Sequence, residues 1–277
     1  MIRSLHSAPA SPSLRPFVRA FAQRTGVGIS ASQPMPSYLE TVIQFDFGDP
    51  PVVRTDGSGW KTTRVRSVVG PHISGETALR FDGVVDSFAI FLQPTGLWLL
   101  FHIPVSAVMG TDFDADDVLG SSAANLWDAL AEQSDFTARV RTAELYLGNY
   151  ISEQLPGTPM SAAAALLARR GGSIAIHDLA AELQLSERQL ERAFLRDIGI
   201  QPKRFARVAR FQAALDARVT GPDRAWVDIA TAGGYHDQMH LVHEFKSFAG
   251  MSPNVTLRRL GDSRPEALAH STKSAHT

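Results

Sequence analysis

Residues 186–199 read SERQLERAFLRDIG, and this stretch decides the fold of the C-terminal part of the chain. Ser186 is followed three residues later by Gln189, which is the spacing of a capping box at the start of a helix. Leu190 and Phe194 lie four residues apart, so a helix would carry both on one face. The stretch therefore predicts a capped helix that buries one face.

The opposite face of that helix carries Arg188 and Arg192. Just upstream, residues 177–185 read HDLAAELQL and predict another short helix, separated from the first by a tight turn. Two helices joined by a turn, with arginines on the outer face of the second, are the arrangement of a helix-turn-helix. An ordinary helical hairpin with a solvated basic face is the alternative.

A repeat favours the helix-turn-helix over the hairpin. Residues 237–253 read DQMHLVHEFKSFAGMSP and match residues 186–202 after a shift of fifty-one positions. The matched pairs are Ser186 and Asp237, Leu190 and Leu241, Phe194 and Phe245, Gly199 and Gly250, and Pro202 and Pro253. Residues 227–235, VDIATAGGY, supply the preceding helix and a glycine turn, so the second copy is also predicted to be a helix-turn-helix.

Residues 229–253, IATAGGYHDQMHLVHEFKSFAGMSP, carry a resemblance to a known family. From about residue 171 to 260 the chain resembles the DNA-binding domain of the AraC/XylS family of bacterial transcription regulators. The resemblance implies two helix-turn-helix units joined by a long helix, each placing its second helix in a major-groove segment on one face of DNA. Gln184 stands where the family usually has glycine, so we expect a left-handed backbone there. His243 replaces a usual arginine, and Met239 replaces a small polar residue.

The expected DNA-binding residues lie on the two second helices, which we term the recognition helices. They are Arg188, Gln189, Glu191, Arg192 and Arg196 on the first, and Gln238, Met239, His240, His243 and Lys246 on the second. Arginine pairs bidentately with guanine, and glutamine pairs with adenine. Between the units, residues 202–218 predict one long helix. Its Lys203, Arg207 and Arg210 either contact phosphates or form a solvated face.

The N-terminal half has a β pattern. Residues 38–49, YLETVIQFDFGD, alternate apolar and polar positions, and further β-branched or aromatic runs follow between turn signals such as DPP, DGSG and FDG. Helical periods follow after residue 94, and an earlier short helix is predicted at about 14–23. The predicted fold is α+β, with an N-terminal antiparallel β-barrel with helices and a C-terminal all-α double helix-turn-helix domain. Residues 70–101 and the order of elements resemble the cupin-like regulatory half of one AraC-type subgroup.

Four regions are expected along the chain. They are a cupin-like sensing or dimerisation domain (1–155), a linker reading PGTPMS (156–161), an AraC-type DNA-binding domain (162–261) and a disordered polar tail (262–277). Residues 157–260 hold fourteen Lys or Arg against ten Asp or Glu, while the remainder holds thirteen against eighteen. A basic module joined to an acidic one is expected where only one domain meets phosphate.

Composition and motifs exclude several classes of site. The 277 residues include no cysteine, which excludes disulfides and thiolate chemistry. The start lacks the apolar run of a signal peptide, and charged and proline residues interrupt the most apolar stretch, 84–105. We therefore expect a cytoplasmic protein with no membrane partner. Nucleophile motifs and phosphate-binding glycine loops are also absent, so no catalytic residue is expected.

Three groups of residues have some features of a metal site. The first group is His236, His240, His243 and Glu244. His236 and His240 have the spacing of a helical zinc pair, but His236 precedes the expected helix cap and so lies in the turn. Residues 112–117, DFDADD, lack the glycine and glutamate of a calcium loop, so a solvated loop capping the next helix is favoured. His72 and His102 could line the barrel, but they have no glutamate partner. We expect no metal and no cofactor.

The sequence therefore predicts a DNA-binding transcription regulator that is not an enzyme. Double-stranded DNA and RNA polymerase are the expected partners, and the N-terminal domain could bind a small-molecule effector or form a homodimer. We expect an activator, although the sequence does not distinguish activation from repression. One alternative is a cupin-like metal-dependent enzyme fused to a DNA-binding domain. Another is an N-terminal half that binds no ligand and serves only as a protein-contact surface.

Overall fold

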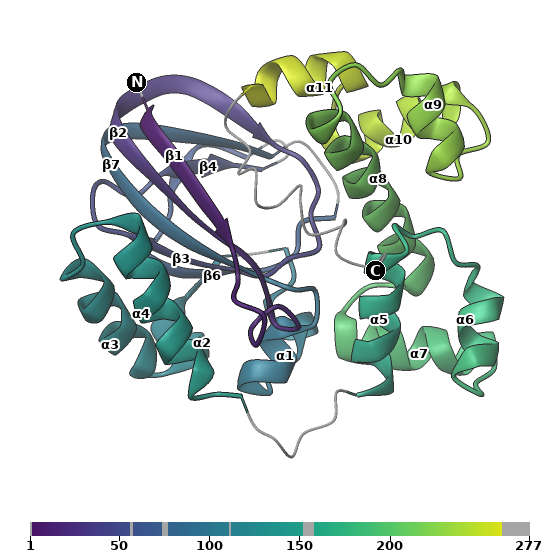
Figure 1. The fold of residues 1–277 in the computed structure, drawn as a ribbon, viewed down its shortest axis with the longest axis horizontal. Coiled ribbons are helices and arrows are strands. Elements are labelled where there is room, and N and C mark those ends of the chain that lie inside the picture. Colours follow the sequence, from purple (N-terminus) through teal and green to yellow (C-terminus); the bar gives the residue numbers. More distant parts are fainter. Residues whose placement is uncertain (1, 56–57, 74–76, 111, 152–157, 262–277) are drawn as a thin grey trace.

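The computed structural model describes residues 2–55, 58–73, 77–110, 112–151 and 158–261. The described chain has a sheet-rich N-terminal half and a helical C-terminal half (Figure 1). The long helix α8 (Pro202–Thr220) lies between the sheet and the helices α6 (Ile176–Glu182) and α9 (Trp226–Ala232). Among the described residues, no helix combines the length and the apolar character needed to span a membrane.

The N-terminal half is built on one antiparallel sheet, as predicted. Its strands in the described ranges are β1 (Ile2–Pro9), β2 (Val18–Met35), β3 (Val42–Asp46), β4 (Val52–Arg54), β5 (Lys61–Thr62), β6 (Arg66–Val69), β7 (Thr77–Leu92) and β8 (Asp112–Asp114). The order is β1-β2-β7-β3-β6-β8, with β4 joined to β7 and β5 to β4. The sheet curls but is not closed, so it is roughly the expected cupin-like barrel.

Short helices cover one face of this sheet. They are α1 (Gly96–Phe101), the 3-10 helix η1 (Val105–Val108), α2 (Ala115–Leu119), α3 (Ser122–Ala131) and α4 (Phe136–Gly148). Ile43 and Phe45 of β3 lie opposite Ile90 and Phe88 of β7, and all four side chains are buried. Together with apolar residues of α3 and α4 they form the hydrophobic core of the N-terminal half. Asp114 caps α2, as predicted for DFDADD. The predicted loop is wrong for residues 112–114, which form β8 and pair with β6.

The predicted helix at 14–23 is wrong. A turn occupies the residues before Val18, and β2 then runs from Val18 to Met35 between β1 and β7. Leu14, Phe17 and Phe21 follow a helical spacing, but pairing on both sides of β2 overrides that local pattern.

The C-terminal half contains α5 (Pro159–Arg169), α6 (Ile176–Glu182), α7 (Glu187–Ile198), α8, α9 (Trp226–Ala232), α10 (Gln238–Ala249) and α11 (Pro253–Leu260). One continuous hydrophobic core joins these helices. Thr158 caps α5, so the later part of the expected linker 156–161 is helical, while 156–157 and the expected tail 262–277 lie outside the described residues.

Candidate nucleic-acid interface

The first recognition helix is α7, and its boundaries are those that the sequence predicts. Ser186 and Gln189 form the capping box, and Gly199 closes the helix with φ of 84°. Leu190 and Phe194 are fully buried, so one face of α7 is fixed in the core. The capping-box prediction and the predicted buried face are confirmed.

The second recognition helix is α10, which repeats this design. The Asp237 carboxylate accepts a hydrogen bond from the backbone N–H of His240 at 2.7 Å, and Gly250 closes the helix with φ of 69°. That bond, followed by the interaction with His236, lowers the pKa of Asp237. Leu241 and Phe245 are fully buried, as their first-unit equivalents are.

The turns of the two units differ in length. Gln184 adopts φ of 55°, which confirms the expected left-handed conformation, and Gly234 adopts φ of 69° in the second turn. Two residues separate Gln184 from α7, and three separate Gly234 from α10. The second turn is therefore one residue longer, and His236 occupies the added position.

The outer side chains of α7 are all exposed, but some of them already form hydrogen bonds within the protein. The exposed set is Arg188, Gln189, Glu191, Arg192 and Arg196. The Gln189 amide oxygen accepts hydrogen bonds from the Ser186 N–H at 2.9 Å and its hydroxyl at 2.8 Å. The Arg196 guanidinium pairs with both carboxylate oxygens of Asp197. Arg188 and Arg192 thus remain the best placed of these residues to donate to a base.

The outer side chains of α10 have a mixed character. Gln238, Met239, His243 and Lys246 are exposed, and Met239 presents an apolar thioether to solvent. His240 is half-buried, with its ring at 5.4 Å from that of Tyr235 in an edge contact. The second helix therefore offers one apolar contact, two side-chain donors and an exposed imidazole.

The candidate phosphate contacts on α8 lie in different environments. Lys203 is exposed. Arg207 Nε donates to Glu244 Oε1 at 2.7 Å, and Arg210 donates to the carbonyl oxygen of Gly234 at 3.2 Å. Arg207 and Arg210 thus connect α8 to the second helix-turn-helix unit.

A groove of about 740 Å³ lies between the two units. Its basic lining comes from Lys203, Arg207 and Arg210, and its acidic lining from Glu187, Glu191 and Glu244. His240 and His243 also line it. Both recognition helices and α8 therefore share one concave, mixed-charge surface.

Two buried polar groups lie beside this groove. Glu244 Oε2 and the Tyr235 hydroxyl have no hydrogen-bond partner among the described residues. Burial, followed by the charge of Glu244, raises the pKa of Tyr235. A pair of polar atoms without protein partners is suited to binding water or a ligand donor.

The histidines do not assemble a metal site in the described parts of the chain. Groups of three or more potential ligands are absent there. His240 Nε2 lies 3.9 Å from Glu244 Oε1, while His236 is exposed in the turn. On the N-terminal side, His72 Nε2 is within 2.9 Å of the Thr77 hydroxyl, and His102 ends α1 in a left-handed conformation.

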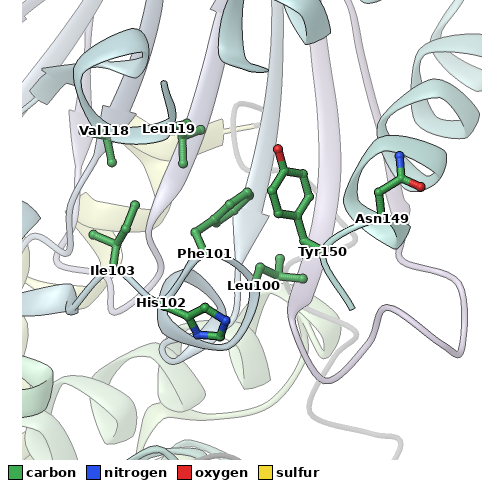
Figure 2. A pocket seen from close by; sticks show the side chains of 8 residues that line it. All are labelled: Leu100, Phe101, His102, Ile103, Val118, Leu119, Asn149 and Tyr150. Atoms are coloured by element: carbon green, nitrogen blue, oxygen red, sulfur yellow. The ribbon is translucent and has the colours of Figure 1, made fainter. Parts of the chain in front are cut away.

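A second candidate site is a pocket of about 420 Å³ in the N-terminal half (Figure 2). Its apolar lining comes from Leu100, Phe101, Ile103, Val118 and Leu119, and its polar lining from His102, Asn149 and Tyr150. The rings of Phe101 and Tyr150 lie 4.8 Å apart, and the Tyr150 and Tyr146 hydroxyls are 3.1 Å apart. The volume of the pocket suits a small molecule, and its lining offers both apolar and polar contacts.

Sequence reasoning missed Glu244 as a structural partner of Arg207. Glu244 lies directly before the buried Phe245 and three residues after the buried Leu241, which places it at the edge of the inner face of α10. That spacing was the available signal. The identity of the partner could not be read from the sequence because Arg207 lies on another helix.

Comparisons with known proteins agree with this geometry. The family described as "Helix-turn-helix domain" matches residues 179–259. An apo variant of ToxT from Vibrio cholerae is 12% identical, with 91% of this chain and 100% of that chain covered and a TM-score of 0.53. Wild-type ToxT from the same organism, bound to an unsaturated fatty acid, is 13% identical. The match covers 87% of this chain and 96% of the ToxT chain, with a TM-score of 0.50. A search of curated proteins gives no match.

The ToxT comparison shows a shared two-part fold at low sequence identity. The family match covers both helix-turn-helix units and the helix between them. Residues 179–259 therefore form an AraC-type helix-turn-helix domain, which supports DNA binding and transcription regulation as the function of this protein.

Proposed function

We propose that this regulator reads DNA with α7 and α10 in successive major-groove segments on one face of the duplex. The observation that carries the proposal is the matched design of the two helices, each capped at both ends, buried on one face and exposed on the other. The major groove of DNA admits an α-helix. Major-groove segments on one face of the duplex recur after one turn of DNA, about 34 Å.

The exposed side chains suggest separate roles. Arg188 and Arg192 donate to guanine, and Met239 contacts a thymine methyl group. Gln189 contributes only its amide N–H groups, because its oxygen already accepts two hydrogen bonds. Lys203 contacts phosphate, since its charge is exposed on the helix between the units.

Glu191, Arg196, Gln238, His240, His243 and Lys246 complete the proposed DNA-facing set. Glu191 can accept a hydrogen bond from a cytosine amino group. Arg196 must first exchange Asp197 for a DNA acceptor, which makes its contribution smaller than that of Arg192. Arg207 and Arg210 act mainly by holding α8 against the second unit.

A footprint of the full chain on its operator tests this proposal. We expect protection of about two helical turns, with the segment contacted by α10 lost in a Gln238→Ala, Met239→Ala, His243→Ala variant. An Arg169→Ala variant, altered at an exposed position of α5, serves as the control. Protection of a single turn that is unchanged in the triple variant contradicts the bipartite reading.

We propose further that the N-terminal half binds a small, mainly apolar effector and is not an enzyme. The pocket in Figure 2 supports this role, since both apolar and polar side chains line it. ToxT, which has a similar fold, has been described with an unsaturated fatty acid bound. Homodimer formation and contact with RNA polymerase are proposed on the family resemblance, with the cytoplasm as the site of action.

A thermal-shift screen tests the effector role. A ligand at one hundred times its dissociation constant stabilises the folded protein by about 2.7 kcal/mol. The stabilisation should fall in a Phe101→Ala variant and persist in Leu145→Ala, which alters an exposed residue outside the pocket. Stoichiometric iron, manganese or zinc bound through His72 or His102 would instead favour the metal-dependent enzyme.

A further inference from the structure

One segment of the sheet domain docks onto the DNA-binding domain. The backbone N–H of Ser37 donates to the carbonyl oxygen of Phe248, in the last turn of α10, at 2.7 Å. Leu39 is buried within the hydrophobic core formed by the C-terminal helices. Glu40 accepts a hydrogen bond from Gln212 of α8 at 2.8 Å. The segment 37–40 thus contacts both α8 and the second recognition helix.

A buried charge cluster reinforces this contact. Arg19 of β2 pairs with Glu40 of its own domain and with Asp216 of α8, the latter at 2.9 Å. All three side chains are at least nine-tenths buried. A buried ion pair holds its partners in a narrow set of geometries, because separation would leave an unpaired charge away from water.

A separate contact holds the first recognition helix. The Ser106 hydroxyl of η1 donates to the carbonyl oxygen of Arg196, in the last turn of α7, at 3.1 Å. Gly199 directly follows the last residue of α7, and a Cβ on Gly199 would lie 2.8 Å from the Ser106 Cα and 2.7 Å from the Met109 side chain. Only glycine permits this approach at φ of 84°.

We infer that the sheet domain sets the separation of the two recognition helices, with Ser106 and Asp216 as positioning residues for DNA reading. Within the C-terminal half, α7 and α10 are joined through α8, on which both pack. The sheet domain adds a second connection, because it contacts the C-terminal end of each recognition helix and the end of α8. Bending of α8 must therefore break contacts with the sheet. The inference rests on the proposed reading of DNA by α7 and α10.

The positioning residues can be altered mildly. Ser106→Ala removes the donor to Arg196, and Asp216→Asn weakens the contact with Arg19 while Glu40 still balances the arginine charge. The matched controls are Ser173→Ala, which removes a hydroxyl bonded to Arg170 within the helical domain, and Asp86→Asn, which weakens an ion pair with Arg139 within the sheet domain.

The first measurement needs no DNA. Because the chain has no cysteine, Ala181→Cys and Ala232→Cys place spin labels on exposed positions of α6 and α9 alone. The full chain and both controls should give one narrow distance distribution. The Ser106→Ala, Asp216→Asn double variant should broaden it at least twofold. An unchanged distribution in that variant overturns the inference.

The second measurement uses operators in which the two half-elements are moved apart or together by one base pair. We expect the full chain to prefer one spacing at least tenfold, and the double variant to lose at least threefold of that preference while the controls keep it. A broadened distance with an unchanged spacing preference overturns the role in DNA reading. If the wild type shows no sequence preference at all, the proposed function fails, whereas the label distances still decide whether the sheet holds the helices.

Discussion

Arg207 of α8 and Glu244 of α10 form an ion pair, with 2.7 Å between Nε and Oε1 and with the Glu244 side chain only 3% exposed. The pair connects the central helix to the helix that we propose enters the second major-groove segment. Arg207 also lies over the Phe248 ring at 5.2 Å, so the same side chain packs against the core. We therefore expect Arg207 to influence DNA binding mainly through the position of α10.

Arg207→Ala should destabilise the folded protein by about 1–3 kcal/mol, because it leaves the buried Glu244 carboxylate without its cation. The partial exposure of Arg207 keeps the loss below that of a fully buried pair. Urea unfolding measures the change. Adding Glu244→Gln should recover part of the stability, and a further loss in the double variant would exclude the ion pair as the cause.

Arg192→Ala should weaken binding to the operator by about 1–3 kcal/mol and relax the preference at one base pair. The reason is the loss of a bidentate donor to a base. Lys203→Ala should instead weaken binding to all sequences alike and reduce the salt dependence. Competition titrations with specific and random DNA separate the two effects. Equal losses on both DNAs for Arg192→Ala would identify it as a phosphate contact.

His243 should make operator binding dependent on pH. A bound phosphate or guanine acceptor favours the protonated form of an imidazole that donates to it. Affinity should therefore be greatest at pH 6 and fall towards pH 8. The groups that share its groove are His177, Glu187, Glu191, Lys203, Arg207, Arg210, His240 and Glu244.

Anisotropy titrations at constant ionic strength test this dependence. The wild type should bind more tightly at the acidic end, and this gain should be missing from both His243→Arg and His243→Gln. The control variant is His240→Gln, which removes the second imidazole of α10, the one that lies near Glu244. Identical profiles in the wild type and both His243 variants would remove His243 from the proposed DNA-facing set.

Two buried carboxyl groups should affect stability in opposite directions as pH changes. Burial alone would raise the pKa of Glu40, but the Arg19 charge and hydrogen bonds bring it below its usual value. Its stabilising contribution is therefore present above about pH 4.3 and is lost as pH falls through the lowered pKa. Burial raises the pKa of Asp46 to about 6, despite hydrogen bonds from Gln44 and Ser87.

Urea unfolding from pH 7 to pH 3 checks both directions. Glu40→Gln should be less stable than the wild type at pH 7, and the difference should shrink below about pH 4. Asp46→Asn should be more stable than the wild type at pH 7, and its advantage should disappear as pH falls from about 6 to about 4. A constant difference across this range, for either variant, would show that the carboxyl group has the same pKa in the folded and unfolded chains.

The sequence was most informative where the determining interactions are local. The capping residues Ser186 and Asp237, and the glycines that end each recognition helix, lie within a few positions of the residues they cap, so spacing alone predicted them. The burial of Leu190 and Leu241 followed from helical periodicity.

Contacts between distant segments could not be predicted in this way. Arg19 and Asp216 are 197 positions apart, and nothing in either local sequence identifies the partner. From helical periodicity alone, Arg207 cannot be told apart from an arginine that faces solvent or binds phosphate. Only the packing of α8 against α10 brings it to Glu244. The β2 strand was missed for the same reason, because its pairing with β1 and β7 is non-local.

The added residue in the second turn limits how the two units can be recombined. A recognition helix could be transplanted from one unit to the other as a cassette from its cap to its closing glycine, since these boundaries coincide in both. A cassette that also included the turn would shift the incoming helix by one position relative to the helix before it. Engineered changes of operator preference in this protein should therefore start at Ser186 or Asp237 and leave His236 in place.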